Sequence, residues 1–510
     1  MASYQIHGGK KLTGTIQTNT SKNSALACMY GCLLTNEDST LENVPKIEEI
    51  ERTREVFHSL GVKTEWENSN LKINPPEKLN WGNLNQVTAA CTRVSLYLIP
   101  VLARQFEKFS LPYPGGCRLG KRTISPLIYA LEKLGFSINL RKGQLYVQKS
   151  QSTTREVEIV MYESSDTGTI AVAMAAALSS VQTTIKFASA NYQVQDLCLM
   201  LQKMGARIED IGTTTLKIQG NPPCSPLQPQ TPRRCRAPFT AAVEQQGQTL
   251  TAPKGSDPVI DSLSPLTKGV SLLSPLTKGV SLLSPLTKGV SLLSPLTKGG
   301  LRGVCYPIMP DPIESMFLIA LACCTNSTLT IQGCPKDFLE LELLKLEKMG
   351  FQFEILKTYL SANQHFQLVD LQTFPSRLVA PVEKLYGRPY PGLNIDNLPF
   401  FVPVATQAHG TTLIHDWVFE NRAIYFMEFQ RLGANLLLAD PHRVFITGKT
   451  TLHSEEIVCP PALRPASVLL IGMLMARGKS ILRNTYSIDR GYENLYERLR
   501  QLGARIEEIE

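Results

Sequence analysis

A short pattern of apolar and polar residues recurs six times along the chain. In each copy an amphipathic stretch ends in Leu-Gly or Met-Gly, and alternating apolar and polar residues follow. The stretch before the glycine is spaced like the buried face of a helix, and the alternation after it is typical of a half-buried strand. Glycine suits the position after a helix because it adopts positive φ without a steric clash. The six glycines are Gly61, Gly135, Gly205, Gly350, Gly433 and Gly503.

Five of the copies continue into a second alternating segment, such as SNLKI, GQLYV, TTLKI and HRVFI. The predicted unit is therefore helix, strand, turn, strand. The glycines are separated by 74, 70, 145, 83 and 70 residues, so one interval is about twice as long as the others. Three units on each side of that interval predict two α/β lobes. Because ligand sites favour the interface between domains, we expect the functional site between the lobes.

The long interval contains an insertion, residues 221–303, with a different composition. It is rich in Pro, Gln and Thr, and it contains four copies of a short repeat, three that read SPLTKGV and a last one that reads SPLTKGG. The copies begin at Ser264, Ser274, Ser284 and Ser294. Low-complexity sequence with Pro and Gly in every copy is typical of a disordered surface loop. A role as an interaction loop is the alternative.

Composition favours a soluble intracellular protein with small anionic ligands. The longest apolar run, residues 170–178, is about half of a membrane span, and residues 1–11 lack the apolar core of a secretory signal. The net charge of +8 is modest for 510 residues, and no basic run with interleaved aromatics indicates nucleic acid binding. The twelve cysteines form no CxxC pair or Cys/His cluster, so neither a zinc site nor a disulfide framework is predicted.

Several dispersed motifs together resemble a known family. They are KNSAL at Lys22, NVPKIEEIE at Asn43, TRVS at Thr92, PGGCRLGKR at Pro114, VFENR at Val418, LRPAS at Leu463 and IDRGYE at Ile488. In this order they resemble the UDP-N-acetylglucosamine enolpyruvyl transferases, also called 1-carboxyvinyltransferases. The resemblance covers residues 1–220 and 304–510, which is the whole chain apart from the insertion.

The resemblance implies a two-lobed inside-out α/β barrel with six repeats. Lobe I would comprise residues 1–21 and 304–510, and lobe II residues 22–220. The implied reaction moves the enolpyruvyl group of phosphoenolpyruvate to the 3-hydroxyl of UDP-N-acetylglucosamine and releases phosphate, the first committed step of peptidoglycan synthesis in the cytoplasm. Such chemistry needs an acid, a base and fixed cations, but no metal or organic cofactor. The sequence does not indicate an oligomeric state.

Cys117 is the candidate proton donor. Its loop has two glycines before it and Arg118, Lys121 and Arg122 after it, and these cations favour the thiolate. By resemblance Cys117 protonates the substrate, can form a covalent phospholactoyl adduct and is the target of fosfomycin. A stabilised thiolate is a better nucleophile, but it leaves less thiol to act as an acid.

Lys22 and Asn23 open an apolar helix that follows the polar segment TNTS. Backbone N–H groups at a helix start favour an anion, which makes this a candidate phosphate corner. By resemblance Lys22 grips phosphoenolpyruvate, Asn23 binds the sugar and Arg93 binds the diphosphate. Arg93 interrupts the otherwise apolar segment TAACTRVSLYLI, which favours a position facing a cleft.

Four further arginines and one aspartate complete the expected site by resemblance. Arg122 and Arg490 would complete the clamp on phosphoenolpyruvate, while Arg464 and Arg422 match family arginines at the cleft and at a position coupled to lobe closure. Asp396, in a loop rich in Pro, Gly and Asn, would be the base or orienting carboxylate for the sugar 3-hydroxyl. A turn-forming aspartate is the alternative interpretation.

Three departures from the family pattern put the acceptor in question. The family motif T-D-L-R-A has an acidic residue where this chain has Ala462, and P-V-D-L-H is replaced by residues 123–127, TISPL. The motif P-D-R-I-E has proline, Pro312, in place of arginine. These changes indicate a divergent paralogue.

Three alternatives therefore stay open. One is the same transfer to another sugar-nucleotide acceptor, and another is a UDP-sugar-binding protein without turnover. The third is the related 5-enolpyruvylshikimate-3-phosphate synthase branch, whose phosphate-binding motif is similar to SDTGT at Ser165. The PGGC loop favours the UDP-sugar branch over the shikimate branch.

Overall fold

Every repeat glycine follows a helix, as predicted. The computed structural model describes residues 2–115, 123–150, 156–221 and 300–509, so nearly all of the predicted insertion lies outside the described residues. The six glycines have φ between +85° and +113°. The helices before them are α2 (Glu48–Ser59), α5 (Ser125–Glu132), α7 (Tyr192–Met204), α9 (Glu340–Lys348), α11 (Glu428–Arg431) and α14 (Leu495–Gln501).

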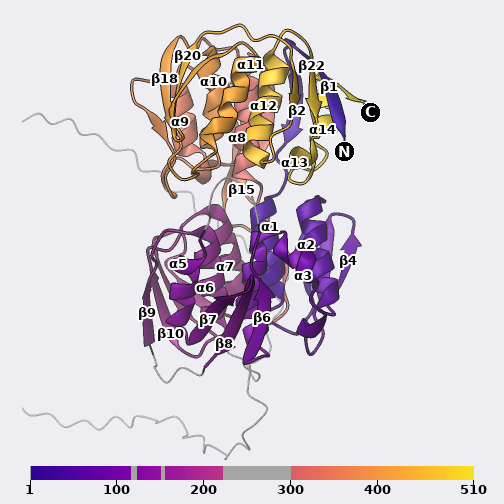
Figure 1. The fold of residues 1–510 in the computed structure, drawn as a ribbon, viewed down its shortest axis with the longest axis vertical. Helices are drawn as coiled ribbons and strands as arrows, with labels where there is room; N and C mark the ends of the chain where they lie inside the picture. The colour runs from indigo at the N-terminus through magenta and orange to yellow at the C-terminus, as the bar shows by residue number, and fades with distance from the viewer. Residues whose placement is uncertain (1, 116–122, 151–155, 222–299, 510) are drawn as a thin grey trace, which may run out of the picture. The chain divides into compact units, whose positions relative to one another are not determined.

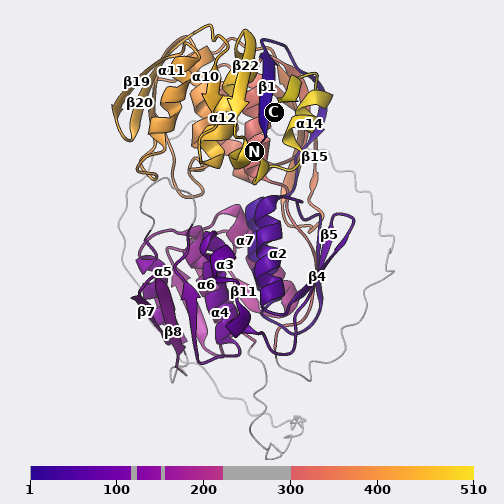
Figure 2. The ribbon, with the colours of Figure 1, turned by 45° about the vertical axis from the view of Figure 1, so that its right-hand side comes forward.

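The predicted strand pairs follow these helices as antiparallel hairpins. They are β4 (Lys63–Glu67) with β5 (Asn70–Asn74), β7 (Phe136–Arg141) with β8 (Gln144–Lys149), β11 (Arg207–Glu209) with β12 (Thr215–Gln219), β15 (Gln352–Leu360) with β16 (Gln367–Phe374), and β19 (Asn435–Asp440) with β20 (Arg443–Gly448). The sixth strand, β23 (Arg505–Ile509), instead pairs with β1 (Ser3–Gly8), which places Ile6 opposite Ile506. Strands from the two ends of the chain therefore complete the sixth repeat, as Figure 2 shows.

The predicted unit is only the second half of the repeat. Each repeat also contains an earlier helix that is buried on nearly all sides, and in α8 every residue is buried. Such a helix has no polar face, so its sequence lacks the amphipathic period that marks the later helix. These buried helices are α1 (Lys22–Cys32), α4 (Leu98–Ala103), α6 (Asp166–Ala177), α8 (Pro312–Cys324), α10 (Phe401–Gln407) and α12 (Leu463–Met475).

Five of the six sheets formed by the described residues share one strand order. In four of them the second strand of the hairpin pairs antiparallel with a third strand, which is β3 (Ser39–Glu42), β10 (Gln182–Lys186), β14 (Thr328–Pro335) or β18 (Gly410–His415). In the fifth, β1 takes the place of the second hairpin strand and pairs antiparallel with β22 (Gly478–Arg483). A parallel strand then completes the sheet: β13 (Cys305–Pro307), β9 (Glu156–Val160), β2 (Thr13–Gln17), β17 (Leu385–Tyr386) or β21 (Glu456–Val458). The sixth sheet has three described strands, β6 (Lys108–Pro112), β8 and β7.

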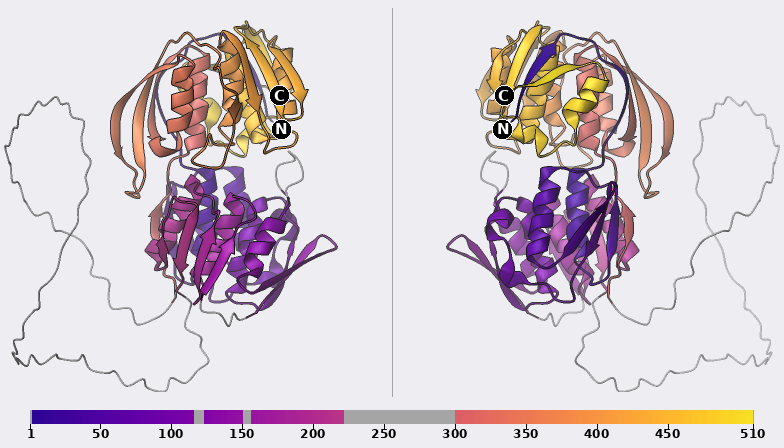
Figure 3. Two further views of the ribbon diagram at one scale, coloured as in Figure 1. Left: turned by 90° about the vertical axis from the view of Figure 1, so that its left-hand side faces the viewer. Right: turned by 90° about the vertical axis from the view of Figure 1, so that its right-hand side faces the viewer.

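Two hydrophobic cores define the lobes. The core of lobe II contains α1, α4 and α6, and the core of lobe I contains α8, α10 and α12. In each lobe the sheets lie outside and the buried helices lie inside (Figures 1 and 3). The fold is thus the expected two-lobed inside-out α/β barrel.

The chain passes between the lobes twice, and the two passages pair with each other. The N–H of Ser21 donates to the Met309 carbonyl at 2.8 Å, and the N–H of Asp311 donates to the Asn19 carbonyl at 2.8 Å. Strand β13 pairs with β3, and Tyr306 belongs to the core of lobe II. Lobe II therefore extends past residue 304, where the sequence interpretation placed the start of lobe I, because this short strand completes the first sheet.

Candidate active site

A cavity of about 570 Å³ is lined by residues of both lobes. This volume falls in the range of small-molecule sites. Seven of the nine predicted site residues line the cavity, while Cys117 and Arg122 lie outside the described residues. The seven are Lys22, Asn23, Arg93, Asp396, Arg422, Arg464 and Arg490.

Lys22 is the first residue of α1 and projects into the cavity. The hydroxyl of Ser21 caps this helix by accepting a hydrogen bond from the Ser24 N–H at 3.2 Å. Lys22 Nζ lies 2.8 Å from Glu49 Oε2. Burial raises the pKa of Glu49, but Lys22 and Arg490 outweigh that effect and hold the pKa below its ordinary value. Glu49 is thus an anion that fixes the Lys22 ammonium at the helix start.

Two arginines of lobe I line the same cavity. Arg464, in the first turn of α12, is buried and donates to the Tyr492 hydroxyl at 3.0 Å. Burial lowers the pKa of Arg464, but Tyr492 and Asp396 outweigh burial, so the guanidinium stays charged. Arg490 follows α13 (Tyr486–Asp489), and within the described part of the chain its buried Nε has no hydrogen-bond partner. A buried donor without a partner among these residues can bind a ligand.

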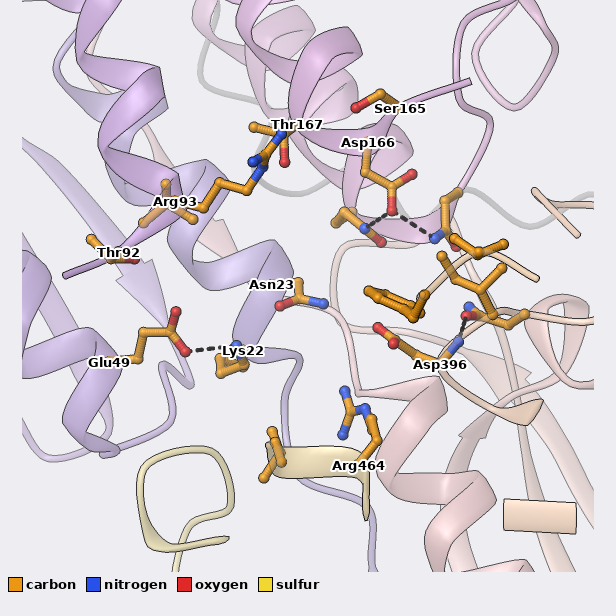
Figure 4. Close-up of a pocket in the computed structure, with 18 of the residues that line it drawn as sticks. Lys22, Asn23, Glu49, Thr92, Arg93, Ser165, Asp166, Thr167, Asp396 and Arg464 are labelled. Carbon is orange, nitrogen blue, oxygen red and sulfur yellow. Dashed lines mark hydrogen bonds and ion pairs between the residues drawn. The ribbon is translucent and has the colours of Figure 1, made fainter. Parts of the chain in front are cut away.

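Asp396 faces Lys22, Asn23 and Arg464 across this space (Figure 4). Its side chain is 30% exposed, and its backbone N–H donates to the Asn394 side chain at 2.9 Å. A partly exposed carboxylate in a cavity is accessible to a substrate hydroxyl.

Arg422 lies behind Asp396 and is almost completely buried. Its Nε and Nη2 donate to the two carboxylate oxygens of Asp416 at 2.5 and 2.9 Å, and Nη2 also donates to the Ile395 carbonyl at 2.6 Å. Its Nη1 lies 3.4 Å from Asp396 Oδ1. With these donors occupied, the geometry fits a positioning role for Arg422 toward Asp396.

Asn23 and Arg93 line the cavity on the side of lobe II. The amide of Asn23 donates to the Tyr192 hydroxyl at 2.9 Å. Arg93 begins the 3₁₀ helix η2 (Arg93–Tyr97), and its Nη2 donates to the Thr123 carbonyl at 2.9 Å. Arg93 therefore contacts the TISPL segment, which departs from the family pattern.

Sequence reasoning missed Asp166 as a cavity residue. Asp166 is the first residue of α6, and its carboxylate accepts hydrogen bonds from Ser189, Asn191 and Gln193. Burial raises the pKa of Asp166, and nearby Asp396 raises it further. Asp166 belongs to the motif SDTGT, which the sequence analysis singled out. The hydrogen-bond partners of Asp166, however, come from a segment more than twenty residues away. Glu49 was missed similarly, although it belongs to the motif NVPKIEEIE.

The structure shows the surroundings of two departures from the family pattern, Ala462 and Pro312. Ala462 precedes α12, is 1% exposed and packs against Phe419, so an apolar contact occupies the place of the expected acid. Pro312 is the first residue of α8, where proline is well tolerated because no helical hydrogen bond is lost. Asp311 caps that helix by accepting from the Ile313 N–H at 2.8 Å.

The described residues contain neither a helix that could span a membrane nor a cluster of metal-ligating side chains. No helix in this part of the chain is long and apolar enough to cross a membrane. Within the same residues, no group of three or more His, Cys, Asp or Glu side chains could hold a metal ion. The nine cysteines described are all free.

Comparison with known proteins identifies the family. The family model described as EPSP synthase (3-phosphoshikimate 1-carboxyvinyltransferase) matches residues 6–231 and 288–499. The chain belongs to this family. The chain is also similar to curated proteins named UDP-N-acetylglucosamine 1-carboxyvinyltransferase. The one from Borrelia garinii is 27% identical over 100% of this chain and 99% of that protein, and the one from Treponema denticola is 29% identical over 99% of each.

Solved structures of enolpyruvyl transferases show the same fold. The enolpyruvyl transferase NikO from Streptomyces tendae has a TM-score of 0.73 and 20% identity, covering 100% of this chain and 99% of that one. EPSP synthase from Acinetobacter baumannii has a TM-score of 0.67 and 14% identity, covering 100% of both chains. At these identities the likeness concerns the fold alone.

Proposed function

We propose that the protein transfers the enolpyruvyl group of phosphoenolpyruvate to the 3-hydroxyl of UDP-N-acetylglucosamine and releases phosphate. The observation that carries this proposal is one cavity in which Lys22, Arg464 and Arg490 gather opposite Asp396. The names of the full-length relatives support the acceptor. A cytoplasmic location is part of the same proposal.

The three cations form the anion-binding side of the proposed site. Phosphoenolpyruvate carries a phosphate and a carboxylate, and Arg is suited to clamp either group through paired N–H donors. The Nε of Arg490, which has no hydrogen-bond partner in the described part of the chain, suits such a contact. Lys22 adds a positive charge at the start of α1, where the helix dipole also favours an anion. Together these groups neutralise phosphate as it leaves.

Asp396 acts as the base in this proposal. It takes the proton from the acceptor hydroxyl, whose oxygen forms a bond to C2 of phosphoenolpyruvate while C3 is protonated. The tetrahedral adduct then loses phosphate from C2 and a proton from C3, which restores the double bond. Arg422 holds Asp396 in place. Cys117 as the C3 acid and Arg122 as a further cation stay predictions from the family resemblance.

Asn23 and Arg93 contact the acceptor in this proposal. Asn23 is the second residue of α1, beside the phosphate corner, and it suits the sugar. Arg93 lies next to Thr123, and its charge suits the diphosphate.

A second candidate is the same reaction on another sugar nucleotide. The observation that favours it is Ala462, which is buried against Phe419 where the family motif has an acid. Arg93 also contacts the altered segment at Thr123. Thr123 lines the cavity beside Arg93, and Ala462 contacts Phe419, which also lines it. Arg93 is a predicted acceptor contact, so the change at Thr123 concerns the acceptor more than phosphoenolpyruvate.

The test is phosphate release from phosphoenolpyruvate with UDP-N-acetylglucosamine, followed by the mass of the product. Wild type is expected to form the enolpyruvyl sugar nucleotide, and Asp396→Asn is expected to lower kcat at least about 100-fold. Asp210→Asn, which changes an exposed ion pair with Lys217, is the matched control and should keep wild-type activity. Cys117→Ser tests the predicted acid in the same assay.

The outcomes separate the candidates. Folded wild type that releases no phosphate with this acceptor contradicts the proposal. Phosphate release with other UDP-sugars only supports the second candidate. UDP-sugar binding measured by calorimetry without phosphate release from any acceptor indicates a binding protein.

A further inference from the structure

Asp166 lies at the edge of the cavity (Figure 4), and its carboxylate accepts hydrogen bonds from three side chains. Ser189 donates to Oδ1, while Asn191 Nδ2 and Gln193 Nε2 donate to Oδ2 at 3.1 and 2.5 Å. All three donors come from the segment that enters α7. An ionised carboxylate only accepts hydrogen bonds, so the two amides must turn their NH₂ groups toward Asp166.

One atom of this cluster has no hydrogen-bond partner in the part of the chain that the structure describes. The other end of Asn191 accepts from the Tyr192 N–H at 3.0 Å, and the Ser189 hydroxyl accepts from the Asn191 N–H at 3.2 Å. Gln193 differs, because its Oε1 is buried and has no hydrogen-bond partner among the described residues. Gln193 is 6% exposed and lines the cavity.

The unpaired Oε1 of Gln193 determines which ligand groups are favoured next to it. A buried acceptor without a donor is costly, so a ligand hydroxyl or N–H would be favoured there. The negative charge of Asp166 behind the amide disfavours a phosphate or carboxylate oxygen at the same point. Asp166 and Asp396 are also close enough to interact electrostatically. The donor therefore belongs near the hydroxyl that Asp396 deprotonates, on the sugar rather than on the phosphates.

We propose that Gln193 determines acceptor specificity by accepting a hydrogen bond, through Oε1, from a hydroxyl or amide N–H of the acceptor sugar. Asp166 is the positioning residue that fixes the orientation of the Gln193 amide. This inference rests on the proposed enolpyruvyl transfer and extends it, because it assigns a residue that reads the sugar.

The experiment compares Gln193→Met with wild type across acceptors that each change one sugar donor. UDP-N-acetylglucosamine is compared with UDP-2-deoxyglucose, which lacks the acetamido group, with a 4-deoxy analogue and with a 6-deoxy analogue. For UDP-N-acetylglucosamine we expect kcat/KM to fall about 10- to 100-fold, with KM for phosphoenolpyruvate unchanged. For the one analogue that lacks the contacted donor, the variant and wild type should be equal.

Gln195→Met is the matched control. Gln195 lies on the same helix, but its amide donates to the Ala190 carbonyl at 2.7 Å and it does not line the cavity. This variant should keep the wild-type kcat/KM for every acceptor. If Gln193→Met does not fold, the wild-type analogue series still tests the contact, since wild type should disfavour one analogue by about tenfold or more.

The results distinguish failure of this inference from failure of the proposed function. An equal loss for all acceptors, or no loss for any, with active wild type overturns the role of Gln193 alone. Equal use of all analogues by wild type also overturns it. No turnover of UDP-N-acetylglucosamine by wild type overturns the proposed function and this inference with it.

Discussion

Replacement of Arg422 by methionine tests the contacts that hold Asp396 in place. The Arg422 and Asp416 side chains are each 1% exposed and are joined by two hydrogen bonds. The substitution leaves the Asp416 carboxylate buried without its partner, which costs about 3–5 kcal/mol. For a lobe of about 200 residues this lowers Tm by roughly 10 °C.

The same substitution should also lower the reaction rate. It removes the hydrogen bond to the Ile395 carbonyl at 2.6 Å and the contact with Asp396 at 3.4 Å. Asp396 then loses its fixed position, and a shift of about 1 Å at a reacting group costs on the order of 100-fold. We expect kcat for phosphate release to fall by about 10- to 100-fold.

A double variant separates stability from positioning. Arg422→Met with Asp416→Leu replaces a buried ion pair with apolar side chains, which is often neutral or stabilising. Its thermal unfolding should return toward wild type, while kcat should stay low because the contacts with Ile395 and Asp396 are still absent. An unchanged Tm in the single variant, or recovery of kcat together with Tm in the double variant, would refute this reasoning.

Three further predictions concern other parts of the molecule. Burial raises the pKa of Asp196 from 3.8 to about 6, so the folded state binds its proton more tightly than the unfolded chain. The protonated group therefore stabilises the folded state below about pH 4, and this contribution to the free energy of unfolding falls by about 3 kcal/mol as the pH rises to about 6. When unfolding is measured from pH 4 to 7, Asp196→Asn should abolish this part of the pH dependence. Gly503→Ala should cost about 1 kcal/mol from positive φ alone, whereas Gly350→Ala should cost more because the new Cβ would lie 2.6 Å from the Arg377 carbonyl oxygen; urea unfolding that ranks them oppositely contradicts this. Arg490→Met should raise KM for phosphoenolpyruvate about 10-fold or more and leave acceptor binding, measured by calorimetry, unchanged.

The outer half of each repeat was predictable because its signals are local. A glycine at positive φ after an amphipathic helix can be recognised from the residues around it, as at Gly205, where φ is 113°. The inner helices could not be placed in the same way, since α8 is buried on every side and has no amphipathic period to detect. Strand β13 was missed because three residues are too short to show alternation.

The candidate site was predictable residue by residue, but the arrangement of its contacts was not. Resemblance located Lys22, Asp396 and Arg464, and all of them line one cavity. It did not show that Glu49 fixes Lys22 or that Asp166 orients Gln193, because each pair joins segments 27 residues apart. Nor did it show that Arg422, which lines the cavity, is paired with buried Asp416, since burial and pairing depend on the whole fold.

The pairing of β1 and β2 with distant strands has a consequence for synthesis on the ribosome. Strand β2 needs β14, and β1 needs β22 and β23, so the first seventeen residues have no sheet partner until most of the chain has been made. Lobe II needs only residues up to Ile308 for its core. Since domains generally fold as they emerge, lobe II can form first while the N-terminal strands wait. Chaperone binding to stalled nascent chains should therefore persist at this N-terminal segment until the last strand has left the exit tunnel.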